Sequence, residues 1–384
     1  MRSSLVLLSV SLLLMQACGG AQAEPVKQPP TGPTTTVTVE PPNDDAGALA
    51  SQADAEVQPP PESLPPAKPT TIRLASAVGD AVDQELDRGD AAFEKNAFDD
   101  ARVHYEAARK AGPKRAGPLV GIARVRIAKS NAPLDYGASK GNAEVTSAVR
   151  DLKAALALQT DNGPAYAELG RAQLMIGDAD AALASLRRGA ELLPNEAEAQ
   201  SALGVALLAT GRKDEALTAL QRAVSIDAGS PPRHGNLGTV LLMVGRVNDA
   251  VHEFEIQARL GDGDARAHSD LGTALLAQNQ IPRATSELER AVQLDGTRPS
   301  YLTNLGYAYQ LIGRRADAIA KYRQALHVDD RFASAWIDLA TALAQDPKTR
   351  AEARAALMTA QKIDASDPRV KANLEELDAL EKGH

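Results

Sequence analysis

The sequence repeats itself every 34 residues, and this period limits the possible folds more than any other feature. A Leu-Gly pair recurs at this spacing, and the last copy reads Leu-Ala: Leu169-Gly170, Leu203-Gly204, Leu237-Gly238, Leu271-Gly272, Leu305-Gly306 and Leu339-Ala340. Twelve residues after each Gly stands an alanine, and four residues later a large apolar residue: Ala182 and Leu186, Ala216 and Leu220, Ala250 and Phe254, Ala284 and Leu288, Ala318 and Tyr322. The pattern predicts two helices per repeat that approach each other closely at the small residues.

A turn signal lies between the two halves of each repeat. The residue is Gly or Asn, the types that tolerate the left-handed conformation at the end of a helix: Gly177, Gly211, Gly245, Asn279 and Gly313. One helical pair cannot bury its own apolar face, so neighbouring pairs must stack. Replacing one of the Leu residues of the Leu-Gly pairs with Ala should therefore cost about 2–5 kcal/mol by cavity formation.

This pattern resembles the tetratricopeptide repeat (TPR), which reads W-x2-L-G-x2-Y, followed by Ala, an aromatic residue and Pro. The best matches are Tyr166-x2-Leu169-Gly170, with Ala182 and Pro194, and Trp336-x2-Leu339. Leu replaces many of the aromatic residues, and position 32 is rarely Pro. The resemblance implies an all-α fold, a right-handed superhelical TPR solenoid.

We expect about eight repeats between residues 71 and 367, and a C-terminal capping helix and tail in 368–384. The repeats are 82–115, 116–162, 163–196, 197–230, 231–264, 265–298, 299–332 and 333–367. The second repeat is too long for the period, which indicates an insertion near 129–144. Asp367 as N-cap and Pro368 at the first helical position predict the start of the capping helix.

The first residues are typical of a signal peptide. Arg2 precedes an apolar run from Leu5 to Met15, which is too short to span a membrane, so we expect residues 1–17 to be an export signal. Cys18, the single cysteine, follows this run and resembles the end of a lipobox, which implies lipidation and, with Gly19 next to it, an outer-membrane lipoprotein. The alternative is cleavage after Ala23, which would release a soluble periplasmic protein.

Residues 18–70 have the composition of a disordered tether. Residues 19–70 hold twelve of the 23 prolines, seven acidic residues and no aromatic residue. Such a segment buries too little apolar surface to offset the entropy of ordering. We expect an inert spacer, or alternatively a Pro-rich docking strip.

Several classes of function are disfavoured by composition and by missing motifs. Aromatic residues make up 3% of the chain and the net charge is −8, which argues against an aromatic-lined ligand pocket and against nucleic-acid binding. One cysteine cannot build a Cys-rich metal site, and the motifs of zinc proteases, serine hydrolases and nucleotide-binding loops are missing. We therefore expect no catalytic residues, no cofactor, no metal and no small-molecule substrate.

The TPR resemblance implies a concave groove lined by the first helix of each repeat, at repeat positions 2, 5, 9, 12 and 13, with position 6 at its edge. The predicted partner-binding residues are Arg171, Leu174, Leu208, Asn236, Thr239, Leu242, Asp270, Thr273, Asn304, Tyr307, Asp338 and Thr341. Amides and carboxylates at position 6 resemble an incomplete asparagine ladder that binds an extended peptide, or they only solvate a helix face. The leucines at position 12 form either an exposed apolar strip or contacts buried between first helices.

These observations predict a non-catalytic scaffold for protein–protein interaction. As an outer-membrane lipoprotein facing the periplasm, it would bind a segment of an envelope protein and support a motility, pilus, secretion or cell-wall machine. The choice among these machines follows from analogy with other TPR lipoproteins. The alternative is a soluble periplasmic, chaperone-like protein released after Ala23.

Overall fold

The computed structural model of the 384-residue chain describes residues 71–76, 78–130, 132 and 137–382. The predicted signal peptide, Cys18 and the Pro-rich tether lie outside these residues. In the described part, the chain is all-α, with 17 α-helices and one short 3-10 helix. No helix of this part is long and apolar enough to span a bilayer.

The predicted all-α TPR solenoid is confirmed, because the helices follow one another in pairs. The first helices of the pairs are α2 (Ala81–Glu94), α4 (Gly117–Lys129), α6 (Gly163–Met175), α8 (Ala197–Ala209), α10 (Pro231–Met243), α12 (Ala265–Ala277), α14 (Pro299–Leu311) and α16 (Ala333–Ala344). The second helices are α3 (Phe98–Ala111), α5 (Ala143–Leu158), α7 (Ala179–Leu192), α9 (Lys213–Ile226), α11 (Val247–Leu260), α13 (Ile281–Leu294), α15 (Arg315–Val328) and α17 (Arg350–Ile363). The last helix is α18 (Pro368–Lys382), and the 3-10 helix is Pro347–Thr349.

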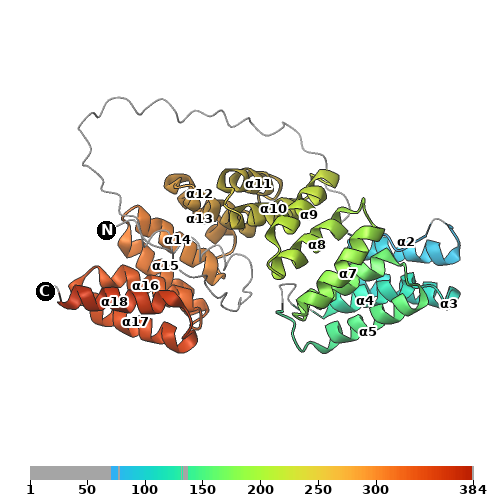
Figure 1. Ribbon diagram of the computed structural model, residues 1–384, viewed down its shortest axis with the longest axis horizontal. Coiled ribbons are helices and arrows are strands. Elements are labelled where there is room, and N and C mark those ends of the chain that lie inside the picture. The colour runs from blue at the N-terminus through green and yellow to red at the C-terminus, as the bar shows by residue number, and fades with distance from the viewer. Residues whose placement is uncertain (1–70, 77, 131, 133–136, 383–384) are drawn as a thin grey trace, which may run out of the picture.

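The pairs are stacked along an arch, from α2 at one end to α18 at the other (Figure 1). Each first helix packs against its own second helix, and each second helix packs against the first helix of the next pair. First helices also contact the first helices of neighbouring pairs, for example α10 with α12 and α12 with α14. The first helices therefore form a continuous row along the arch.

The close approach predicted from the small residues is present within each pair. A Cβ atom on Gly272 would lie 2.6 Å from Cγ of Leu288 and 3.3 Å from the backbone oxygen of Ala284. Gly170, Gly204, Gly238 and Gly306 meet the large residue of their own second helix in the same way. Leu288 and Ala284 are fully buried, so the spacing of the pattern corresponds to a close contact in the core of each such pair.

The turns between the helices of a pair have the predicted left-handed conformation. The φ angles are +83° at Gly177, +80° at Gly245 and +61° at Asn279. Behind each turn, a backbone amide bonds to a carbonyl of the first helix, as from Arg246 N to Leu241 O at 2.9 Å. These turns fix the reversal of the chain.

Replacing Gly245 with Ala should lower the free energy of unfolding by about 1–2 kcal/mol, because a Cβ atom disfavours the left-handed conformation. Nothing lies within 4 Å of the added Cβ atom, so the effect is one of backbone strain alone. Chemical denaturation followed by circular dichroism measures the change. Gly263→Ala is the matched control, because Gly263 is equally uncrowded but its φ is not positive, and it should change stability by less than about 0.5 kcal/mol.

The residues that directly precede α5, from Gly137 on, contact the C-terminal end of α6. The amide of Gly137 donates to Leu174 O, and the amide of Ser139 donates to Met175 O, both at 2.9 Å. The side chain of Asn142 then accepts from Glu144 N and Val145 N and caps α5. The described part of the predicted insertion thus bonds to two carbonyl groups in the last turn of α6.

Helix α18 covers the last pair. Val370 and Leu377 are buried against α16 and α17, and Leu374 is half-buried beside them. Arg354 on α17 forms ion pairs with Asp378 at 2.5 Å and Glu381 at 2.8 Å. The end of the solenoid therefore presents a charged surface instead of an apolar one.

Candidate functional site

The predicted groove residues divide into two groups by exposure. Half-buried residues are Arg171, Leu208, Asn236, Thr239, Asp270, Asp338 and Thr341. Buried residues are Leu174, Leu242, Thr273, Asn304 and Tyr307. All twelve lie on first helices, from α6 to α16. Their role in partner binding stays a prediction, but only the first group is accessible enough for a partner to touch the side chain directly.

The leucines at position 12 do not form an exposed strip. Leu174, Leu242 and Leu276 are at most 8% exposed, and Leu208 packs against the same core. The physical reason is the direct contact between successive first helices, which leaves space for a side chain but not for solvent. The expectation of an exposed apolar surface at Leu174 and Leu242 is therefore wrong, and the packing alternative describes these residues.

Hydrogen bonds between first helices order the polar residues of the row. Asn304 Nδ2 donates to Thr273 Oγ1 at 3.1 Å, and Thr273 Oγ1 donates to Ser269 O at 2.8 Å. Asn236 Nδ2 donates to Ser201 Oγ at 3.3 Å. Each amide is thus held by the preceding first helix, in one orientation.

A segment that the sequence analysis missed lies against the N-terminal part of this row. Residues 71–76 precede α2, and Ile72 is 3% exposed between Ala167 of α6 and Ala199 of α8. Leu74 is also buried, and its amide donates to Asp90 Oδ2 at 2.8 Å. The segment therefore crosses from α8 to α2, opposite to the order of the repeats. The alternation of apolar Ile72 and Leu74 with Arg73 was the available signal.

Arg124 holds this segment in place. Its Nη2 donates to Ile72 O at 2.9 Å, its Nε to Glu168 Oε1 at 2.8 Å and its Nη1 to Asp90 Oδ1 at 3.1 Å. The Arg124 side chain is 4% exposed, and the hydroxyl of Tyr105 donates to the same Asp90 oxygen at 2.7 Å. One buried cation thus links three repeats and an extended main chain.

Burial and charge act against each other on the acids of this network. Burial raises the pKa of Asp90, although the Arg124 charge acts in the opposite direction. Burial also acts to raise the pKa of Glu168, but the charges of Arg124 and Arg171 outweigh it, so the net direction is down. Glu168 is therefore ionised and compensated.

The carboxylates farther along the row are less well compensated. Burial raises the pKa of Asp270 to about 6, against the charge of Arg266, whose Nε lies 3.5 Å from Oδ2. Burial raises the pKa of Asp338 also to about 6, and the main opposing charge is Arg369. Arg369 itself pairs with Asp367 at 2.7 Å and donates to Ser334 Oγ.

Replacing Asp338 with Asn should stabilise the fold at pH 8 but not at pH 4. The folded-state pKa near 6 lies above the ordinary value of 3.8, so the folded protein binds this proton more tightly than the unfolded chain. The stability that the proton contributes is present below pH 4 and is lost as the pH rises through about 6. Asn mimics the neutral acid, so we expect a gain of about 1–2 kcal/mol at pH 8.

Denaturation curves of the wild type and Asp338→Asn at pH 4, 6 and 8 measure this difference. Asp214→Asn is the control, because Asp214 lies exposed on α9. A stability difference between wild type and Asp338→Asn that is independent of pH would contradict the assignment.

The buried histidines hold the junctions between repeats. Nδ1 of His234 lies 2.7 Å from Glu253 Oε2, and its Nε2 lies 2.9 Å from Ala228 O. In the next repeat, His268 contacts the equivalent two groups, the carboxylate of Glu287 and the backbone oxygen of Asp262. Trp336 Nε1 donates to Asp330 O at the equivalent place. These rings are used for packing and hydrogen bonding, and no cluster of metal-ligating side chains occurs within the described residues.

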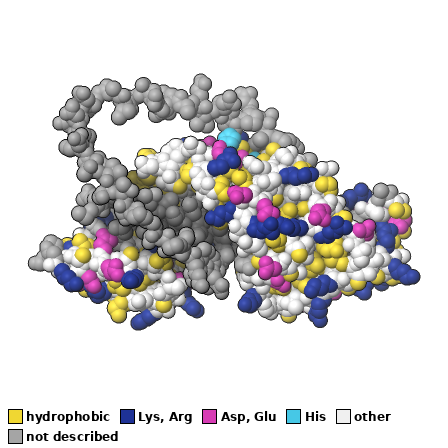
Figure 2. All heavy atoms as spheres, in the orientation of Figure 1, with side chains coloured by type: hydrophobic (Ala, Val, Ile, Leu, Met, Phe, Trp, Pro, Cys, Tyr) yellow, Lys and Arg dark blue, Asp and Glu magenta, His cyan; other side chains and the backbone are white. Residues whose placement is uncertain are grey.

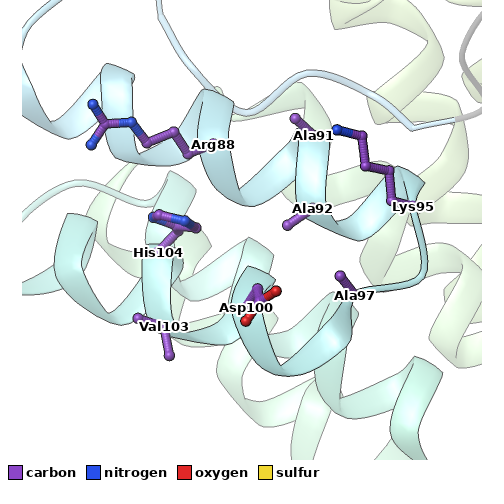
Figure 3. Close-up of a pocket in the computed structure, with 8 residues that line it drawn as sticks. All are labelled: Arg88, Ala91, Ala92, Lys95, Ala97, Asp100, Val103 and His104. Atoms are coloured by element: carbon purple, nitrogen blue, oxygen red, sulfur yellow. The ribbon is translucent and has the colours of Figure 1, made fainter.

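Outside the row, the surface offers weak candidates. A shallow pocket between α2 and α3 is lined by Arg88, Ala91, Ala92, Lys95, Ala97, Asp100, Val103 and His104 (Figure 3). His104 in this pocket is already paired with Glu85 at 2.7 Å. On the face shown in Figure 2, acidic and basic side chains are interspersed over the part that holds α4 to α8. The row of first helices therefore remains the candidate site.

The fold and the row of first helices define an α-solenoid of stacked helix-turn-helix pairs that presents a face for protein contacts. Tetratricopeptide repeat models match residues 176–241 and 303–368. The chain is thus a TPR repeat protein, a class that typically acts as a scaffold for protein–protein interaction and is typically non-catalytic. A model of the bacterial transcriptional activator domain also matches residues 238–331, a stretch that runs from within α10 to just past the end of α15.

One solved structure supports the fold, and others show a weaker similarity. The crystal structure of the APC/C hetero-tetramer Cut9–Hcn1 is similar with a TM-score of 0.60 and 15% identity, over 79% of this chain and 57% of that chain. The pilF protein of Pseudomonas aeruginosa has a TM-score of 0.48 and 19% identity, over 56% of this chain and 97% of its own. YrrB, a TPR protein with an unusual peptide-binding site, has a TM-score of 0.39 and 19% identity, over 50% and 97%. No curated protein sequence matches the chain.

Proposed function

We propose that the face formed by α8, α10, α12, α14 and α16 binds an extended segment of another protein, and that the chain holds this partner in an assembly of the cell envelope. We call this face the C-terminal groove. Its residues at repeat positions 5, 6 and 9 include Ser201, Asn236, Thr239, Asp270 and Asp338.

The observation that carries the proposal is the chain's own extended segment on the same row of helices. Residues 71–76 are bound through their main chain, by Arg124 at Ile72 O and by Asp90 at Leu74 N. Both side chains stand at repeat position 9 of a first helix. A side chain that bonds to a backbone group recognises an extended chain with little regard to its sequence. The first-helix face of this protein is thus suited to an extended polypeptide.

The C-terminal groove has the residue types for the same mode of binding. The amide of the half-buried Asn236 is oriented by Ser201, so little entropy is lost when a peptide bonds to its remaining polar atoms. Thr239 is half-buried at position 9 of α10. Small and polar side chains at these positions leave room for a backbone to approach.

The envelope part of the proposal is supported by the sequence of residues 1–70. An export signal in 1–17 followed by Cys18 fits a lipid-anchored chain at the outer membrane, facing the periplasm, and the Pro-rich segment fits a spacer. The mass of the mature protein tests this directly. Acyl chains on Cys18 would support the anchor, whereas an N-terminus at Glu24 would support the soluble, chaperone-like alternative.

Crosslinking and co-purification from intact envelopes test the groove. We compare wild type with Thr239→Arg, which places a long side chain in the groove, and with Thr218→Arg, which places the same side chain on the exposed face of α9. Capture of one multi-protein assembly by wild type and Thr218→Arg, but not by Thr239→Arg, is the expected result. Equal capture by all three folded proteins would refute the groove as the binding site. A broad mixture of unrelated exported chains would favour the chaperone-like function.

A further inference from the structure

A recurrent contact joins each first helix to the next helix of the row: the residue at repeat position 9 bonds to the residue at position 6 of the next repeat or, at the C-terminal end, to the sixth residue of the capping helix α18. Arg124 bonds to Glu168 at 2.8 Å, Thr273 accepts from Asn304 at 3.1 Å, and Thr341 accepts from Asn373 at 3.2 Å. The contact is built from a cation and an acid in one case and from a hydroxyl and an amide in the other two. In each case the position-6 side chain has a partner on the preceding first helix.

Two carboxylates in the same row lack a cation at that place. In the repeat that precedes Asp270, position 9 is Thr239. In the repeat that precedes Asp338, position 9 is Tyr307. Asp270 forms an ion pair at 3.5 Å with Arg266 of its own helix, whose side chain is 56% exposed, and it accepts from Gln257 Nε2 at 3.3 Å. Asp338 forms no ion pair within the residues that the structure describes, and the nearby Arg369 is engaged by Asp367. Among the described residues, no cationic side chain therefore takes the place beside Asp338 that the Arg124 guanidinium takes beside Glu168.

The place that the Arg124 guanidinium occupies beside Glu168 is next to the main chain of residues 71–76. The same guanidinium that neutralises Glu168 also donates to the carbonyl oxygen of Ile72 in the extended segment. A cation at the equivalent place in the C-terminal groove, beside Asp270 or Asp338, would thus lie next to the backbone of a bound peptide. A side chain of that peptide is in the right place to supply it.

We infer that the C-terminal groove recognises an extended peptide with two basic side chains, arginine or lysine, one at Asp270 and one at Asp338. This inference rests on the proposed function and specifies the partner's chemistry. Asp270 and Asp338 lie on α12 and α16, with α14 between them, and α12–α14 and α14–α16 are in contact. Helix axes in contact are about 10 Å apart, so the two sites are separated by roughly 20 Å. An extended chain rises about 3.3 Å per residue, which places the two basic residues about six positions apart.

Fluorescence anisotropy with the full chain tests this at low salt, where charge pairs are least screened. The probe is a labelled peptide of Gly, Ser and Thr with two arginines about six residues apart. A peptide of the same composition with adjacent arginines is its control. We expect the spaced peptide to bind wild type about ten-fold more tightly than the adjacent one, and Asp270→Asn with Asp338→Asn to abolish this preference. Asp214→Asn, on the exposed surface of α9, should leave it unchanged.

The outcomes separate the two proposals. If Thr239→Arg prevents binding of the spaced peptide but the double Asn variant does not, the groove binds peptides without reading their charge, and the inference is overturned while the proposed function stands. If neither variant changes binding, both fail. Tighter binding of a synthetic copy of residues 24–70 than of the spaced peptide would identify the chain's own N-terminal region as the occupant and would also overturn the inference. The Asn variants should unfold at denaturant concentrations no lower than wild type, so loss of folding is excluded by the same samples.

Discussion

Arg124→Ala should lower the free energy of unfolding by about 3–5 kcal/mol, because removing one partner of a buried ion pair leaves the other charges buried and unpaired. Arg124 is 4% exposed and bonds to Glu168, Asp90 and the carbonyl of Ile72. Both acids are themselves at most 7% exposed, so water cannot replace the lost guanidinium without opening the packing. Chemical denaturation of the full chain followed by circular dichroism measures the change.

The same variant should also loosen residues 71–76. The Leu74 amide donates to Asp90, and Asp90 is held by Arg124, so the Leu74 amide should exchange its hydrogen faster in the variant. Arg102→Ala on α3 is the control, because Arg102 is 55% exposed and its ion pair with Glu106 is long, at 3.9 Å. It should cost less than about 0.5 kcal/mol. A loss below about 1 kcal/mol for Arg124→Ala would show that the network contributes little to the stability of the first repeats.

The sequence predicted the fold because the repeat pattern directly encodes a contact. Gly272 and Leu288 are 16 residues apart, and the structure brings them into close contact between α12 and α13. The same contact recurs at Gly170, Gly204, Gly238 and Gly306, so the pattern is visible in a single sequence. The turn residues are predictable for a similar reason, since a left-handed φ at Gly245 or Asn279 restricts the residue type strongly.

The groove was only partly predictable, because its details depend on contacts between different repeats. Which side chains face a neighbouring first helix depends on the superhelical packing of the repeats. As a result of this packing, Leu174 and Leu242 are buried and Asp338 is half-buried. The extended segment 71–76 has no helical period and is too short for a repeat pattern. Its position depends on Arg124, whose three partners lie 34 to 52 residues away in the chain. No local sequence signal combines these residues.

Leu288→Ala should lower the free energy of unfolding by about 2–5 kcal/mol, because it opens a cavity between α12 and α13. Leu288 is fully buried and is the residue that fills the space above Gly272. Leu294→Ala on the same helix is the control, since Leu294 is 36% exposed and should cost about 1 kcal/mol or less. Denaturation of the full chain compares the two variants directly.

Combining Leu288→Ala with Gly272→Ala tests whether these two positions specify each other. Gly272→Ala alone should cost about 1–3 kcal/mol, because its Cβ atom would lie 2.6 Å from Leu288 Cγ and the side chain would have to move. In the double variant the new methyl group enters the cavity left by the leucine, so the loss should be smaller than the sum of the single losses by about 0.5–3 kcal/mol. Strict additivity would mean that the backbone of Ala284, 3.3 Å from the same Cβ position, limits the approach instead. The coupling free energy between the two substitutions therefore shows what the 34-residue pattern reflects: the fit of two side chains, or the distance between two helix backbones.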